Sequence, residues 1–156
     1  MTSPEGSTVT FRRIPNGIRP RALQQFAQKL QREVSKGRRF DCLVTGDAEL
    51  QRLNREFRGK DEPTDVLSFP IVTELPPARR SRPELGDLAI SLARARRQAR
   101  EFGHTTELEI RVLMLHGVLH LMGMDHESDG GEMLRAEKRW RTRLGLPNGL
   151  IERVQS

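Results

Sequence analysis

The chain has 156 residues, of which 35% are hydrophobic and 31% are charged, and its formal net charge is +6. This length suits one domain with one sizeable core, and the composition is globular rather than disordered. The most apolar region, around 112–124, is interrupted by two histidines and is too short to span a bilayer, which needs roughly 20 apolar residues. The single cysteine, Cys42, excludes an intrachain disulfide and fits a reducing compartment. Because the first residues lack an apolar signal segment, we expect a cytoplasmic protein.

The positive charge comes almost entirely from arginine, with twenty-three Arg against four Lys. An arginine side chain presents a planar fork of donors that matches phosphate, so this bias points to an anionic partner. A solvated surface encoded by a GC-rich genome gives the same composition. The arginine content alone does not separate these two explanations.

In the first half of the chain, residues 9–13 read as a strand, and the chain then breaks between Pro15 and Pro20. Apolar residues recur at helical spacing over 21–35, and Gly37 ends that helix. A strand is expected over 39–45, and Asp47 is expected to cap a helix that reaches Phe57. A turn-like segment then leads into a strand over 66–69, which ends at Pro70.

In the second half, the Pro- and Arg-rich segment 74–83 is expected to be a mobile loop. A strand over 85–91 leads into a basic helix over 92–102. Thr105 or Thr106 is expected to cap the next helix, which ends near Gly123, and a last helix covers 131–144. The tail after about 146 is expected to be frayed. About four strands and five helices in mixed order indicate one layered domain of the α+β class, with α/β as the other possibility.

Three of the four histidines fall in one short stretch, His116 to His126, which reads HGVLHLMGMDH. His116 and His120 are four residues apart, so a helix places them about 40° apart on one face. Gly123 can make the turn that brings His126 back to the same point. Three imidazoles suit zinc and leave its fourth position for water, as in catalytic rather than structural sites. His104 is expected at the surface or in a helix cap, not as a ligand.

The same histidine spacing defines the metzincin metalloproteases, H-E-x-x-H-x-x-G-x-x-H. In that pattern a glutamate follows the first histidine and acts as the general base, but here the position is Gly117. Peptide hydrolysis by that mechanism is therefore poorly supported. Asp125 and Glu127 are nearby carboxylates; we expect Asp125 to orient an imidazole or form the turn, and Glu127 to be exposed.

Three segments together resemble the bacterial YbeY family, which are metal-dependent endoribonucleases of ribosomal RNA maturation. HGVLHLMGMDH is similar to that family's H-G-x-L-H-L-x-G-x-D-H signature. LNREFRGKDEPTDVLSFP, which begins at Leu53, resembles its L-N-x-x-x-R-x-K-D-x-P-T-D-V-L-S-F-P block, and LGDLAIS, which begins at Leu85, resembles its L-G-D-I-x-I-S strand. The resemblance covers about residues 40–144 and appears in the family order.

The resemblance implies a four-stranded mixed sheet and a zinc ion, one per chain, held by His116, His120 and His126. It also implies catalytic roles for His116 and for Arg58 in RNA cleavage. From the residues alone, Arg58 follows an apolar helix, where its guanidinium could clamp a phosphate. The alternative is an exposed arginine that is favoured by the helix C-terminus.

Several further residues near these motifs have expected roles. Ser68 and Phe69 could line the cleft as part of an edge strand. Thr64 and Asp65 read as turn and capping residues, and Asp87 reads as structural.

The implied substrate is single-stranded ribosomal RNA, met in the maturation and quality control of the small ribosomal subunit, with ribosome-associated proteins as further partners and no membrane. Phosphate contacts would come from arginines in the loop and on two helices, or these are solvated helix faces. They are Arg79, Arg80, Arg82, Arg94, Arg96, Arg97, Arg100, Arg135, Arg139 and Arg143. Aromatic residues make up only 4% of the chain, so no base-stacking platform is expected. The alternatives are a metzincin-like peptidase and a non-catalytic ribosome-assembly factor with a structural metal.

Overall fold

The fold is taken from a computed structural model that describes residues 6–13, 16–71 and 84–155. One mixed sheet of four strands forms its centre, in the order β1-β2-β4-β3. The strands are β1 (Thr8–Phe11), β2 (Arg39–Thr45), β3 (Val66–Pro70) and β4 (Glu84–Ser91). β1, β2 and β4 run parallel, while β3 pairs antiparallel with β4 and forms an edge. The expected four-stranded mixed sheet and single α+β domain are confirmed. The predicted loop 74–83 and its arginines lie outside the described residues.

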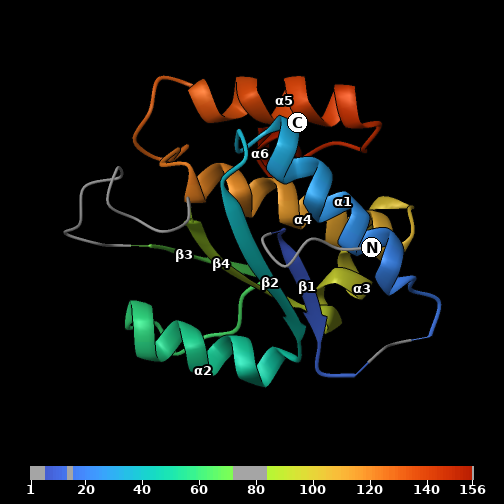
Figure 1. The fold of residues 1–156 in the computed structure, drawn as a ribbon. Coiled ribbons are helices and arrows are strands. Elements are labelled where there is room, and N and C mark those ends of the chain that lie inside the picture. Colours follow the sequence, from blue (N-terminus) through green and yellow to red (C-terminus); the bar gives the residue numbers. More distant parts are fainter. Residues whose placement is uncertain (1–5, 14–15, 72–83, 156) are drawn as a thin grey trace.

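Helices cover both faces of the sheet (Figure 1). They are α1 (Pro20–Glu33), α2 (Asp47–Arg58), α3 (Leu92–Phe102), α4 (Thr106–Leu121), α5 (Glu132–Leu144) and α6 (Leu150–Gln155). α1 and α4 pack on one face, α2 covers the other, and α5 and α6 form an outer layer on α4. None of the helices in the described ranges is long and apolar enough to cross a membrane.

α4 is the central helix of the core, and most of its residues are buried on every side. A helix that is apolar all round can be stable only in such a position, between the sheet and a further layer. Its first turn is capped by Thr105, whose side chain accepts a hydrogen bond from the Leu108 amide at 3.1 Å. α4 therefore places His116 and His120 between the sheet and α5.

The helix predicted over 21–35 begins one residue earlier, at Pro20, where the missing N–H of proline costs nothing. Two local expectations, at Asp47 and in the tail, are wrong. Asp47 does not cap α2, because its carboxylate accepts hydrogen bonds from Arg94 and Ser91, and Gly46 is the N-cap.

The tail is also not frayed over its described part. Residues 150–155 form α6, and Leu146 and Ile151 are buried. Two ion pairs, Arg141 with Glu152 and Arg153 with Glu109, hold this short helix against α5 and α4.

Candidate metal centre and adjoining cleft

The histidine motif forms the predicted cluster. His116 and His120 project from one face of α4, with their Nε2 atoms 3.1 Å apart. Gly123, at φ +95°, follows the end of the helix and lets the chain turn back, since only glycine takes this left-handed conformation readily. The His126 ring then lies 6.0 Å from that of His116 and 5.8 Å from that of His120, measured between centroids. One nitrogen from each ring lies within 4.8 Å of the others, so the group could hold a metal ion.

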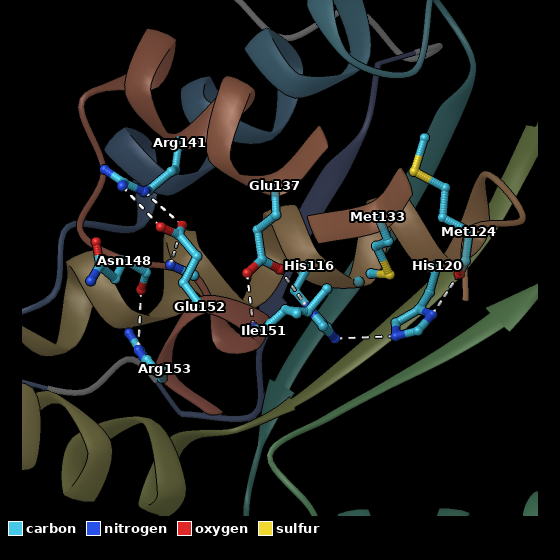
Figure 2. A network of polar contacts seen from close by, with 12 residues as sticks. His116, His120, Met124, Met133, Glu137, Arg141, Asn148, Ile151, Glu152 and Arg153 are labelled. Atoms are coloured by element: carbon cyan, nitrogen blue, oxygen red, sulfur yellow. Dashed lines mark hydrogen bonds and ion pairs between the residues drawn. The ribbon is translucent and has the colours of Figure 1, made fainter. Parts of the chain in front are cut away.

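The Nδ1 atoms of His116 and His120 already have hydrogen-bond partners. Nδ1 of His116 lies 2.8 Å from a carboxylate oxygen of Glu137, and Nδ1 of His120 lies 2.9 Å from the carbonyl of Met124 (Figure 2). Because both partners are acceptors, both Nδ1 atoms carry the proton, which leaves the two Nε2 atoms as lone-pair donors.

These converging lone pairs fit a cation. Two nitrogens that bind zinc tetrahedrally at about 2.0–2.1 Å are about 3.4 Å apart, close to the spacing of the two Nε2 atoms. Burial lowers the pKa of His120, and the imidazoles of His116 and His126 lower it further. The neutral form, which is the ligating form, is therefore favoured.

Glu137 is not among the residues predicted above, yet it orients His116. It projects from α5, is only 1% exposed, and contacts an imidazole 21 residues away in the sequence. The available signal is its position directly after Ala136 and four residues after Met133, both buried on α5. A charged residue on a buried helix face needs a partner, and here the partner is a histidine of the cluster.

The other carboxylates and the fourth histidine have different roles. Asp125 forms the turn, because its Oδ1 accepts from the Glu127 amide at 3.1 Å, and Glu127 is exposed as expected. His104 has the second of its two expected places, in a helix cap, because its amide donates to the Ala99 carbonyl at 3.0 Å just after the C-cap of α3. Its side chain is only 9% exposed, and Nε2 lies 2.6 Å from the buried carboxylate of Glu109. As expected, His104 is not part of the histidine cluster.

Arg58 ends α2 and faces the same cleft as the histidines. Gly59 follows in the left-handed conformation, and the Nη2 of Arg58 donates to the backbone carbonyl of Ser68 at 2.7 Å. The cleft has a volume of about 500 Å³, and its walls include Arg58 and all three histidines of the cluster. The fold thus brings together two motifs that are more than fifty residues apart in the sequence.

The edge strand β3 forms one wall of this cleft, but only one of the two residues predicted to line it does so. Ser68 lines the cleft, and its hydroxyl donates to the carbonyl of Gly117 at 3.1 Å. Phe69 points to the opposite face, where its ring packs edge-on against Phe57 at 5.5 Å. Successive side chains of a strand alternate between faces, so the side chains of Ser68 and Phe69 point to opposite sides of the sheet.

Other predicted residues have structural contacts. Asp65 lines the cleft, but its oxygens accept from the Val66 amide and from Gln98. Asp87 is on the opposite side of the sheet from the histidines, beside Phe69. Burial raises the pKa of Asp87, and the nearby carboxylate of Asp41 raises it further.

The arginine stripes are present on the helix surfaces. Arg96, Arg97 and Arg100 are exposed on α3, while Arg94 turns away to pair with Asp47. On α5 the exposed arginines are Arg135, Arg139 and Arg143.

Comparisons with known proteins agree with the motifs. A family model described as endoribonuclease YbeY matches residues 12–145. A protein of Solibacter usitatus named endoribonuclease YbeY is 65% identical over 156 residues, which is the whole of both chains. A Koribacter versatilis protein of the same name is 44% identical over 138 residues, covering 88% of this chain and 86% of the relative. A Thermotoga maritima protein solved in solution superposes with a TM-score of 0.55 at 28% identity, covering 88% of this chain and 93% of the other.

Proposed function

Because the chain belongs to the YbeY family, we propose that it is a zinc-dependent endoribonuclease that cleaves single-stranded ribosomal RNA in the cytoplasm during maturation and quality control of the small ribosomal subunit. The observation that carries the proposal is the shared cleft. It joins three imidazole nitrogens suited to a divalent ion with the guanidinium of Arg58. That combination suits a phosphodiester, which is anionic and gains charge in the transition state.

The residues of the cleft would have different roles in the reaction. His116, His120 and His126 would hold the ion, and a zinc ion held there supplies Lewis-acid chemistry toward the phosphate. Arg58, anchored on the Ser68 carbonyl, would bind the non-bridging phosphate oxygens and stabilise their developing charge. The exposed arginines of α3 and α5 would add contacts to the RNA backbone or to ribosome-associated partners.

Cleavage of a ribosomal RNA fragment by the purified protein tests this proposal. Arg58→Ala should lower the rate about 10²–10³-fold, the loss typical for removal of one charge-stabilising donor. Arg55→Ala is the matched control, because Arg55 lies one turn earlier on α2, pairs with Asp61 and does not line the cleft. His116→Ala and His126→Ala should both abolish cleavage. His126→Ala is the cleaner test, because His126 is exposed whereas His116 holds a buried carboxylate.

Other outcomes would favour the two alternatives. Undiminished RNA cleavage by Arg58→Ala and both histidine variants would refute the proposal. Casein cleavage that a chelator abolishes, without RNA cleavage, would indicate a metzincin-like peptidase, although Gly117 offers no base. Unfolding on metal removal, without nuclease activity, would indicate an assembly factor with a structural metal. Elemental analysis of the purified protein should find about one zinc per chain.

A further inference from the structure

The buried carboxylate of Glu137 connects the histidine cluster to the end of the chain. One of its oxygens lies 2.8 Å from Nδ1 of His116. The other accepts a hydrogen bond from the backbone amide of Ile151, in α6, at 2.9 Å (Figure 2). Both oxygens are thus engaged, by groups 35 residues apart in the sequence, and the plane of the carboxylate is fixed.

The backbone at Gly149 also lies directly against the side chain of Glu137. A Cβ atom added at Gly149 would overlap the side chain of Glu137, although φ at Gly149 is not in the left-handed region. Gly149 is therefore required for close approach rather than for a turn. The segment from Gly149 to Ile151 forms the wall against which Glu137 is held.

Ion pairs on both sides fasten the tail to the helices of the metal centre. The Glu152 carboxylate receives two hydrogen bonds from Arg141 of α5, at 2.7 and 2.9 Å. Arg153 donates two to Glu109, at 2.8 and 2.7 Å, and Glu109 lies on α4, the helix that carries His116. Glu109 is fully buried, so this second pair is a firm attachment.

We propose that the C-terminal segment, residues 149–153, is a positioning element of the metal centre, which raises its affinity for zinc by holding Glu137 against His116. A carboxylate partner fixes the tautomer and direction of a ligating imidazole, and loss of such a partner typically costs 10–100-fold in metal affinity. Because coupling is reciprocal, zinc must stabilise the docked tail by the same factor. The inference rests on the proposed metal centre but not on RNA cleavage.

A pair of substitutions at Ile151 separates the hydrogen bond from ordinary packing. Ile151→Pro removes the amide hydrogen in the first turn of α6, where no hydrogen bond within the helix is lost, and keeps an apolar side chain. Ile151→Ala keeps the amide hydrogen and removes more buried apolar surface. Zinc affinity, measured by competition with a chelating dye, should fall 10–100-fold in Ile151→Pro and change less than about threefold in Ile151→Ala. Equal affinities in Ile151→Pro and wild type, or equal losses in both variants, would overturn the proposal.

The unmodified protein provides a second test that needs no variant to fold. Hydrogen exchange at the amides of residues 149–153 should slow at least tenfold when zinc is added to the metal-free protein. Unchanged exchange there, while zinc binds stoichiometrically, would refute the coupling and leave the metal centre intact. Absence of zinc binding by the wild-type protein would instead refute the metal centre, and the positioning role with it.

Discussion

Gly117 lies where α4 approaches the sheet most closely, and an alanine there should destabilise the protein. A Cβ at this position would lie 2.7 and 3.2 Å from the two methyl carbons of Leu88 and 3.3 Å from a methyl carbon of Val66. Non-bonded carbons prefer a separation of about 3.5–4.0 Å, so the Leu88 side chain, which is only 2% exposed, must move by roughly 1 Å. Such overpacking typically costs about 1–3 kcal/mol, while alanine gains about 1 kcal/mol of helix propensity over glycine.

The expected net loss for Gly117→Ala is therefore up to about 2 kcal/mol in the free energy of unfolding, measured in urea. For a chain of this size, a loss of about 2 kcal/mol corresponds to a fall in Tm of about 4–8 °C. Gly130→Ala is the control, since no atom lies within 4 Å of its added Cβ and its φ is not left-handed. That variant should be as stable as the wild type or slightly more so.

The decisive measurement is to make Gly117→Ala in a variant whose side chain at position 88 is smaller. Leu88→Ala alone should cost about 2–5 kcal/mol, because it leaves a cavity in the core. In that background the added methyl group no longer meets Leu88, so Gly117→Ala should become neutral or stabilising. The sign of the effect would then differ between the two backgrounds, with a coupling energy of about 1–3 kcal/mol. The same loss in both backgrounds would show that the contact with Leu88 is not the cause.

Three further predictions concern other parts of the molecule. Burial raises the pKa of Cys42 to about 12, so its thiol should not react with a disulfide reagent at pH 8 until urea unfolds the chain. The hydrogen bond from Arg19 lowers the pKa of Glu107 in the folded protein. In urea unfolding, wild type should therefore be more stable than Glu107→Gln at pH 7, and this advantage should shrink as the pH falls below about 4.3. A constant difference down to pH 2 would contradict this cause. Arg153→Met removes the arginine partner of the buried Glu109 carboxylate, which keeps its contact with His104. This change should cost about 3–5 kcal/mol of unfolding free energy, part of which a second change, Glu109→Gln, should restore.

The parts of the site that could be predicted from the sequence are those that local geometry determines. The placement of His116 and His120 on one face follows from the period of a helix, and the return of His126 follows from the turn at Gly123. The strands were also predictable, because β-forming residues and breakers mark their limits.

The unpredicted parts depend on contacts between distant segments. Glu137 orients His116 only because α5 packs on α4, and no local pattern fixes that packing. α6 has six residues, which is too short for a readable helical period, and ion pairs to α4 and α5 hold it. Arg58 was predicted through its motif, whereas its anchor, the Ser68 carbonyl, follows from how α2 packs against the β3 edge.

The sequence shows what Gly117 lacks, and the structure shows why a side chain does not fit there. In the metzincin pattern this position carries the catalytic glutamate, but here the path that a side chain would take is filled by Leu88 and Val66. The same close approach lets the Ser68 hydroxyl reach the Gly117 carbonyl, which ties α4 to β3. Since Arg58 is anchored on Ser68, the absence of a side chain at 117 also helps to hold the guanidinium in the cleft of the histidines. One glycine thus removes the protease base and permits the packing that pairs an arginine with the candidate metal centre.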